Sequence, residues 1–421
     1  MKRFIALFVL LMLAVSVSMA AAETLNVNIW DNNQLAGLKQ IADEWSAQSG
    51  IDVNINVVDW DNYWTLLEAG AYGGDLPDVF WTHSNTVQMY MDADLLLNLN
   101  DYIANDEAID LNNYYEGIVD LYTRDDGNVY AVPKDHDTIA LLYNKALFDQ
   151  YGVAYPTDDW TWEDYKAAAE AITAASGGEV YGGACNTGNN QDTFYNIIYD
   201  FGGFVISDDK KTSGWNDPNT LKAFDFMATL FNNAWAPQQM LAENGKDRLF
   251  LNKKIAMDTE GSWMISQFYN DDNHEDYAWA MLPYEDVNGN GQCDEGERVS
   301  IYNGLGWAAS ADVKDPAAAW SLIEWFSSKE MQLKQSELGV TMAGYIGCSE
   351  AFMNAFPGMD ISAFLKMETE GTLVFRPYSK YTSRWEDQAT SDLVAVWNDA
   401  SVMNDVLNRM AGDMNALLAQ E

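Results

Sequence analysis

Residues 25–30, LNVNIW, alternate apolar and polar side chains, as a β-strand with one buried face does. The next stretch, 34–50, ends at Gly50, a residue type that commonly terminates helices. Its apolar side chains fall on one helical face: Leu35, Leu38, Ile41, Ala42 and Trp45. Residues 51–58, IDVNINVV, alternate again. A strand, a helix and a strand in this order favour a parallel sheet, so the sequence predicts an α/β fold.

Further strands and helices continue this pattern along the chain. Strands are predicted at LPDVFW (76–81), VYAVPKD (129–135), TIALLYN (138–144), KIAMDTEGSW (254–263), YAWAMLPYE (277–285) and RVSIYNGLGWAAS (298–310). Amphipathic helices are predicted at 161–172, 219–234 and 315–328, with several more between 360 and 420. Thr161 and Asp164 have capping-box spacing, and Asp315 before Pro316 is a helix start.

The composition permits a large packed core and argues against polyanionic partners. The chain has 421 residues, of which 48% are hydrophobic, and this length predicts two or more lobes. Its formal charge is −41, from 64 acidic and 23 basic residues. Such a field repels nucleic acids and anionic lipid surfaces, so neither is expected as a partner.

The first 22 residues have the organisation of an export signal. Lys2 and Arg3 precede an apolar run at 4–17, and small residues at 20–22 form a cleavage site before Glu23. The run is too short for a membrane span, and no later stretch approaches the length that a span needs. No Cys lies at the cleavage site, so no lipid anchor is expected. We therefore expect an exported monomer, free in the periplasm or extracellular space.

Three cysteines in an oxidising compartment leave at least one thiol unpaired. Cys185 and Cys348 both lie near segments that we place at a cleft, so they can form a disulfide. Three free thiols are an equally compatible interpretation.

The order of these segments resembles a known family. The strongest motif is YAVPKDHDTIALLYNKALFDQYGV at 130–153, and FWTHSN at 80–85, TWEDY at 161–165, GSW at 261–263 and YNGLGWAAS at 302–310 add to it. The chain resembles the extracellular solute-binding proteins of ABC sugar importers, the maltose-binding-protein family, over nearly all of its mature length.

The resemblance implies a type II periplasmic-binding-protein fold, in which a ligand cleft lies between two α/β lobes. About three chain crossings join the lobes, near 137–142, 303–307 and 339–345, and the lobes close by hinge bending. The N-terminal lobe is then 23–137 plus 305–338, and the C-terminal lobe is 138–304 plus 339–421. The implied function is capture of a disaccharide or oligosaccharide and its delivery to the membrane subunits of an ABC permease.

A sugar has apolar faces, on which aromatic rings stack, and a rim of hydroxyls, to which polar side chains hydrogen-bond. The candidates lie at strand ends, where open α/β sheets bind ligands, or are implied by the resemblance. The candidates on the N-terminal side are Trp30, Asp31, Trp81, His83, Ser84, Asn85, Asp135 and Asp137. Those on the C-terminal side are Asp192, Tyr195, Trp263, Asn303, Arg376 and Trp385.

Several of these residues have a purely structural interpretation. Asp135 and Asp137 fit a surface turn as well as a sugar site, and the helix with Trp385 can simply be packed. Trp45, Trp320 and Trp325 lie on helical faces, so they are assigned to the core.

Two other functions are compatible with parts of the sequence. A binding protein of the same fold for a polyamine also uses acidic and aromatic side chains. A secreted glycosidase needs two carboxylates, and among 64 acidic residues a pair is uninformative. The chain has no G-x-S-x-G, no H-E-x-x-H and no phosphate-binding glycine loop, and its three histidines lack metal-ligand spacing. We therefore expect a binding protein and not an enzyme.

A separate motif, DVNGNGQCDEGE at 286–297, matches the twelve-position calcium loop of the EF-hand. Gly291 occupies the position of the sharp turn. The predicted ligands are Asp286, Asn288, Asn290, Gln292 through its carbonyl, Asp294 and Glu297. The flanking segments are predicted strands instead of helices, so we expect a structural Ca²⁺ in a loop within a hairpin. A solvated acidic turn is the alternative.

Overall fold

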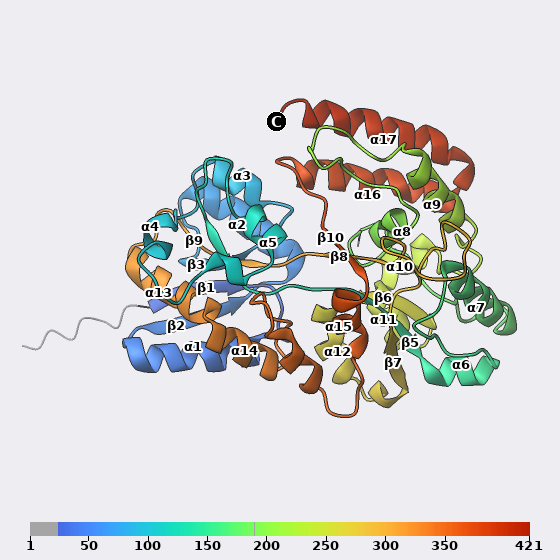
Figure 1. Cartoon of the computed structure of the whole chain (residues 1–421), viewed down its shortest axis with the longest axis horizontal. Coiled ribbons are helices and arrows are strands. Elements are labelled where there is room, and N and C mark those ends of the chain that lie inside the picture. Colours follow the sequence, from blue (N-terminus) through green and yellow to red (C-terminus); the bar gives the residue numbers. More distant parts are fainter. Residues whose placement is uncertain (1–23, 189) are drawn as a thin grey trace, which may run out of the picture.

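The computed structural model describes residues 24–188 and 190–421, so the proposed export signal and its cleavage site lie outside the described residues. Two α/β lobes lie side by side and are connected near the middle of the molecule (Figure 1). One lobe contains the first strands of the chain, and the other contains its C-terminal helices. The predicted α/β class is confirmed.

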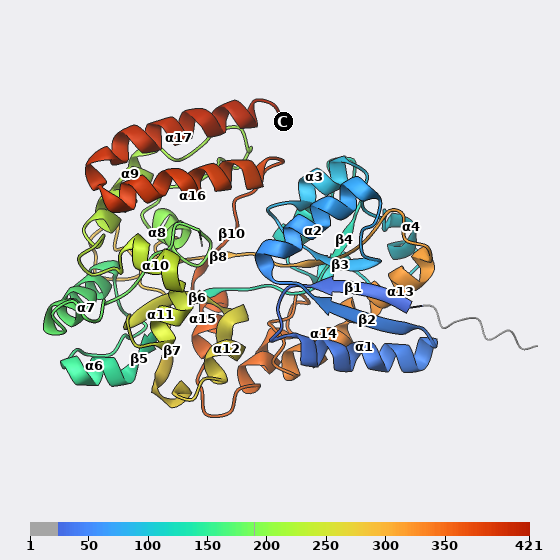
Figure 2. The same cartoon turned by 180° about the vertical axis from the view of Figure 1, so that it is seen from behind.

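The N-terminal lobe is built on a five-stranded sheet in the order β2-β1-β3-β9-β4. Strand β1 (Thr24–Ile29) pairs in parallel with β2 (Asp52–Val57) and β3 (Val79–Thr82). Strand β9 (Gly306–Ala309) runs antiparallel between β3 and β4 (Ala131–Pro133). The helices α1 (Leu35–Ser49) and α2 (Trp60–Gly73) lie on opposite sides of β1 in both views (Figures 1 and 2).

The C-terminal lobe is built on a three-stranded antiparallel sheet in the order β6-β5-β7. Strand β5 (Ile139–Asn144) lies between β6 (Met257–Gly261) and β7 (Tyr277–Ala280), and all six of its residues are buried. Helices pack around this sheet to form the core of the lobe.

A two-stranded parallel sheet joins β8 (Val299–Tyr302) to β10 (Thr372–Phe375). The predicted hairpin of 277–285 with 298–302 is therefore wrong, because β7 pairs with β5 whereas β8 pairs with β10. The predicted strand at 298–310 is divided into β8 and β9, which belong to different sheets. The break at 303–305 carries the chain from one lobe to the other.

The chain crosses between the lobes in three places. Residues 134–138 connect β4 to β5, and residues 303–305 connect β8 to β9. The third crossing follows α14 (Lys329–Glu337), because Val340 packs in the N-terminal core and Met342 in the C-terminal core. The residue limits given above for the two lobes stay a prediction.

The remaining helices follow the order of the chain. Between β3 and β5 they are α3 (Val87–Asp92), α4 (Asn100–Ile103), η1 (Leu111–Asn113) and α5 (Glu116–Leu121). Up to β7 they are α6 (Lys145–Tyr151), α7 (Trp162–Ala175), α8 (Phe194–Asp200), α9 (Pro218–Ala228), α10 (Gln238–Asn244), α11 (Lys246–Leu251), η2 (Ser262–Met264), α12 (Ile265–Tyr269) and η3 (His274–Asp276). After β9 they are α13 (Pro316–Ser327), η4 (Ser349–Asn354), α15 (Ser362–Thr369), α16 (Thr382–Asn398), η5 (Ala400–Val402) and α17 (Met403–Leu418).

The predicted helix signals operate as expected. Gly50 ends α1 in the left-handed conformation, and Thr161 with Asp164 forms a complete capping box at α7. The Asp315 side chain caps α13, which begins at Pro316. Trp45 and Trp320 lie in the N-terminal core, with Trp325 packed against it. None of the helices within the described ranges is long and apolar enough to cross a membrane.

Candidate functional site

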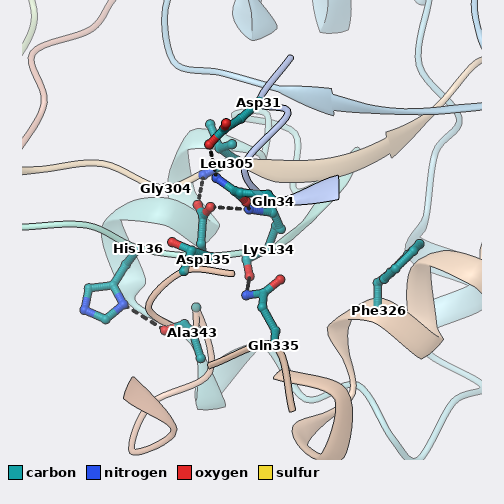
Figure 3. A network of polar contacts seen from close by, with 12 residues as sticks. Asp31, Gln34, Lys134, Asp135, His136, Gly304, Leu305, Phe326, Gln335 and Ala343 are labelled. Atoms are coloured by element: carbon teal, nitrogen blue, oxygen red, sulfur yellow. Dashed lines mark hydrogen bonds and ion pairs between the residues drawn. The ribbon is translucent and has the colours of Figure 1, made fainter. Parts of the chain in front are cut away.

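The first crossing is fixed by a buried lysine (Figure 3). Lys134 is fully buried, and its Nζ donates to Gln34 Oε1 at 2.6 Å and to Asp135 Oδ2 at 2.7 Å. The same Nζ lies 4.4 Å from the centre of the Trp81 ring. The other oxygen of Asp135 accepts from the Leu305 amide at 2.7 Å, which connects the first crossing to the second. Burial lowers the pKa of Lys134, although the charge of Asp135 opposes this shift.

Two glutamines of α14 connect the first crossing to the third. Gln332 and Gln335 both donate through Nε2 to the Lys134 carbonyl, at 2.8 and 3.0 Å. Gln332 Oε1 accepts from the Gly344 amide at 2.8 Å. All three crossings are therefore held together by buried side chains.

His136 extends this connection into the C-terminal lobe. Its Nδ1 is 2.7 Å from the Ala343 carbonyl, and its Nε2 is 3.1 Å from Glu368 Oε2 on α15. The Tyr115 ring packs on His136 with centroids 4.2 Å apart, and its hydroxyl donates to Glu368. Burial opposes ionisation of Glu368, but the hydrogen bonds from His136 and Tyr115 outweigh it and lower the pKa of this carboxyl.

Asp137 connects the first two crossings on the other side. One of its oxygens accepts from the Asn303 amide at 2.9 Å and from Gln191 Nε2 at 2.7 Å. Burial, followed by the nearby charge of Asp135, raises the pKa of Asp137. Asp135 and Asp137 are thus brought together as expected, but their oxygens hold the hinge. For Asp135 the interpretation as a surface turn is wrong, since this residue is 5% exposed. Asp137 is partly exposed.

A group of aromatic rings lies at the carboxyl ends of β1 and β3. We call Trp30, Trp60, Trp64 and His83 the aromatic wall. Trp60 is the first residue of α2, and Trp64 follows one turn later. Both pack against Trp30 and His83, with centroids between 5.1 and 6.3 Å apart throughout the group. Helix α2 begins here because the Asp59 side chain caps the amide of Asn62. The sequence prediction included Trp30 and His83 but missed Trp60 and Trp64.

Trp81 does not present a ring face to a ligand. It is fully buried between Trp30, at 4.8 Å, and Trp307, at 5.9 Å between centroids, with Lys134 over its ring. The predicted stacking role of Trp81 is therefore wrong, because β3 is an inner strand that is covered on both faces. Asp31, also predicted, accepts from the Asn33 amide and from Gln34, so it shapes the turn after β1.

His83 is neutral because of its surroundings. Asn303 Nδ2 lies 2.9 Å from His83 Nε2, and Asn85 Oδ1 lies 2.8 Å from Nδ1, so one ring nitrogen accepts and the other donates. Burial, with the nearby cation of Arg376, lowers the pKa of His83 to about 3. Asn303, which the sequence analysis placed on the C-terminal side, therefore connects the second crossing to the aromatic wall.

Arg376 forms a second polar link between the lobes. It follows β10, and its guanidinium donates to Ser84 Oγ at 2.9 Å, to Asn190 Oδ1 at 3.2 Å and to Glu386 at 2.7 Å. Ser84 follows β3 in the N-terminal lobe, whereas Glu386 belongs to α16. The prediction brought Ser84 and Arg376 into one site, and they are in direct contact. Asn190 and Glu386 were missed.

The remaining C-terminal candidates are less accessible than predicted. Tyr195 and Trp385 lie in the hydrophobic core and are 0% and 2% exposed. The prediction that they contact a ligand is therefore wrong, and both side chains pack in the core. The Trp385 indole donates to Ser379 Oγ at 3.0 Å. Trp263 lies in η2, the short helix that follows β6. It is partly buried against a small hydrophobic cluster that contains Ile139.

Asp192 belongs to a buried charged cluster. Lys246 Nζ lies 3.2 Å from Asp192, 3.2 Å from Asp258 and 3.1 Å from Glu260. All four side chains are at most 5% exposed. Burial raises the pKa of Asp258 to about 7, because one lysine cannot neutralise three carboxylates away from water. Asp192 thus contacts an internal cation and not solvent.

The loop at 286–297 is wrapped by its own hydrogen bonds. Asp286 accepts from the amides of Asn290 at 3.0 Å and Gly291 at 2.8 Å, and Gly291 has φ 74°. Asp294 Oδ2 accepts from the Asn288 and Asn290 side chains, and Glu297 Oε2 accepts from the Asp294 amide. Within 24–188 and 190–421, no group of three or more His, Cys, Asp or Glu side chains has the geometry of a metal site.

The three cysteines are all free. Cys185 and Cys348 are buried, and Cys293 is exposed. The disulfide between Cys185 and Cys348 is therefore not formed, and the alternative interpretation of three unpaired thiols is the correct one.

Two lobes, three hinge crossings and polar side chains gathered where they meet give the chain the architecture of a two-lobed binding protein. The chain belongs to the bacterial extracellular solute-binding protein family, whose model matches residues 30–333. Its architecture is the type II periplasmic-binding-protein fold. An ABC substrate-binding protein from Listeria monocytogenes, solved in complex with cycloalternan, superposes with a TM-score of 0.83 at 22% identity, covering 94% of this chain and 99% of that one.

Other relatives show the range of the family. The maltotriose-binding protein of Pyrococcus abyssi is 27% identical over 345 residues, which are 78% of this chain and 67% of that protein. The erythritol/L-threitol-binding protein of Mycolicibacterium smegmatis is 22% identical over 360 residues, 76% of this chain and 70% of that protein. The GacH receptor of Streptomyces glaucescens, studied with acarbose, superposes with a TM-score of 0.80 at 19% identity, covering 94% of this chain and 99% of that one.

Proposed function

We propose that this protein binds a neutral saccharide between its lobes and delivers it to an ABC importer. The aromatic wall carries this proposal, because partly exposed indoles beside amide and hydroxyl groups are the surface on which sugar rings stack and hydrogen-bond. The wall lies against Asn303 of the second crossing, so a ligand seated there contacts the hinge. A maltotriose-binding relative and a neighbour solved with cycloalternan are consistent with an oligosaccharide.

Hinge closure supplies the mechanism. Ligand contacts that form in the closed arrangement alone stabilise that arrangement, and the closed protein then presents both lobes to the permease. Export to the periplasm or extracellular space and a monomeric state complete the proposal.

A polyamine is the weaker candidate on structural grounds. The acidic side chains that would hold its ammonium groups are already engaged: Asp135 pairs with Lys134, and Asp137 accepts from Asn303 and Gln191. A cation placed there would first have to displace these hydrogen bonds, at a cost of roughly 1–3 kcal/mol for each buried group left unpaired. The relatives named above are binding proteins and not enzymes, which supports binding over catalysis for this chain.

Titration of the mature chain tests this function. Intrinsic tryptophan fluorescence is followed during addition of maltotriose, mannotriose, cellotriose or raffinose, and separately of spermidine. A saturable response to one or more saccharides supports the proposal. Saturation by spermidine with no response to any saccharide contradicts it, and release of shorter sugars during incubation would identify an enzyme.

A structural Ca²⁺ in the loop at 286–297 is a second part of the proposal. The donor set consists of carboxylate, amide and carbonyl oxygens, which suit a hard cation. The fold of the loop supports it: Asp286 accepts from the amides four and five residues later, and Gly291 makes the sharp turn with φ 74°. Asp286, Asn288, Asn290, Gln292, Asp294 and Glu297 would hold the ion. Asp294 Oδ2 accepts from the Asn288 and Asn290 side chains, so we expect both amides to turn away from Asp294 when the ion binds.

A further inference from the structure

One tryptophan differs from all others in the described part of the chain. Trp60 is 42% exposed, whereas the remaining tryptophans there are buried or partly buried. It is the first residue of α2, directly after the Asp59 cap, so its backbone is fixed by the helix start. A partner that covers this indole gains about 25 cal/mol of binding free energy for each Å² of apolar surface removed from water. Burial of the exposed Trp60 surface under a ligand therefore favours binding.

The plane of Trp60 is held by its neighbours. The rings of Trp30, Trp64 and His83 stand at 84°, 83° and 85° to it, with centroids 5.1 to 5.5 Å away. Three perpendicular rings resist rotation of the indole, so a ligand that stacks on it does not have to order a mobile side chain. This is the preorganisation that makes a stacking platform effective.

The rings that pack against Trp60 are uncharged. His83 is buried and neutral, with both ring nitrogens hydrogen-bonded. The Asp59 carboxylate accepts from Asn62, and the Asp31 carboxylate accepts from Asn33 and Gln34. These hydrogen bonds leave both carboxylates negatively charged, but the rings against Trp60 are uncharged, so the indole can stack on an uncharged ligand.

Two polar atoms beside this surface have no hydrogen-bond partner among the residues that the structure describes. Trp64 Nε1 is a donor without an acceptor, and Asn303 Oδ1 is an acceptor without a donor. Both are buried, so each costs free energy until it is paired. A hydroxyl group can accept from the first and donate to the second, which a purely apolar ligand cannot do.

We propose that Trp60 is the stacking platform for a pyranose ring and that it restricts the ligand to cyclic saccharides, to the exclusion of short acyclic polyols. A pyranose presents a flat patch of CH groups on its ring face, with hydroxyls around it. A flexible tetritol has the hydroxyls but no fixed apolar face, so it gains little from the indole. This inference rests on the proposed saccharide function and adds the residue and the ring requirement.

The test compares three variants on one helix. Trp60→Ala removes the platform, Trp60→Phe keeps a smaller aromatic face, and Tyr72→Ala is the matched control, because Tyr72 lies on α2 and is 87% exposed. Calorimetric Kd values are measured with the trisaccharides named above and with erythritol, and thermal melts report folding. Trp60→Ala is expected to raise the Kd for the trisaccharide about tenfold and Trp60→Phe to retain most of the affinity.

The outcomes separate the inference from the function on which it rests. Weakening by Trp60→Ala, no change with Tyr72→Ala, similar melting temperatures and no saturation by erythritol support the stacking platform. If the trisaccharide binds wild type and Trp60→Ala equally, or erythritol binds as tightly as the trisaccharide, the inference is wrong and saccharide binding stands. If no saccharide binds the wild type, the proposed function itself fails.

Discussion

The Nζ atom of Lys134 lies 4.4 Å from the centre of the Trp81 ring and 2.7 Å from Asp135 Oδ2. This lysine is fully buried, and its main-chain carbonyl accepts from both Gln332 and Gln335. One residue of the first crossing thus contacts the core of the N-terminal lobe and the helix before the third crossing. The lysine anchors the hinge to the N-terminal lobe, so rotation is expected at the residues that follow it.

Replacement of Lys134 by Met tests this anchor. Removing one partner of a buried ion pair leaves Asp135 charged in the interior, which costs roughly 3–5 kcal/mol. We expect Lys134→Met to lower the free energy of unfolding by that amount in urea denaturation. The double variant Lys134→Met with Asp135→Asn should regain part of the loss, because the unpaired charge is gone. A double variant no more stable than the single one would contradict this account.

Part of this hinge followed from the sequence and part did not. The resemblance placed the first crossing near 137–142, whereas residues 134–138 form it and β5 begins at Ile139. Asp135 and Asp137 were identified as polar residues beside this crossing. Gln34 and Gln332 were missed, since their contacts with Lys134 span 100 and 198 residues and leave no local pattern. The same limit explains the incorrect hairpin: β8 pairs with β10, which lies about 70 residues further along the chain.

The aromatic residues illustrate a second limit. Trp81 ends a strand, and position alone cannot distinguish an inner strand, covered on both faces, from an accessible edge. Trp60 and Trp64 carry a local signal: two tryptophans lie four residues apart, at a helix start that follows the carboxyl end of a strand.

Acid should destabilise the folded protein through His83. Its pKa is lowered to about 3 in the folded state, by burial and by the nearby Arg376, from an ordinary value of 6.5. The unfolded chain therefore binds a proton that the folded chain does not, and stability is lost as the pH falls from about 6.5 toward 3. We expect His83→Gln to show a shallower fall in melting temperature between pH 6.5 and 4.

The matched control for this experiment is His274→Gln, since His274 lies in η3, outside the aromatic wall. It should keep the wild-type pH profile. A profile of His83→Gln identical to that of the wild type would show that His83 is not the titrating group.

The cluster around Lys246 should give the opposite pH dependence. Burial raises the pKa of Asp258 from its ordinary value of 3.8 to about 7. Between these values the folded protein holds a proton that the unfolded chain has released, so stability is lost as the pH rises through about 7. Asp258→Asn removes this titration, and we expect its melting temperature to change less than that of the wild type between pH 5 and 8. Asp272→Asn, at an exposed position, is the control. Equal slopes for Asp258→Asn and the wild type would contradict the assignment.

Calcium should stabilise the protein through the loop at 286–297. A ligand that binds the folded state alone adds about 2.7 kcal/mol when its concentration is 100 times the Kd. The melting temperature in millimolar CaCl₂ is therefore expected to exceed that in EDTA by several degrees, with MgCl₂ giving a smaller rise because Mg²⁺ requires stricter octahedral geometry.

The calcium-dependent difference should disappear in Glu297→Gln, which lacks the bidentate carboxylate, and persist in Asp272→Asn. Since Glu297 also accepts from the Val287 and Asp294 amides, the variant can melt earlier even in EDTA. The decisive quantity is thus the difference between the two conditions within each variant, and equal melting temperatures of the wild type in CaCl₂ and EDTA would leave the loop as a turn held by its own hydrogen bonds.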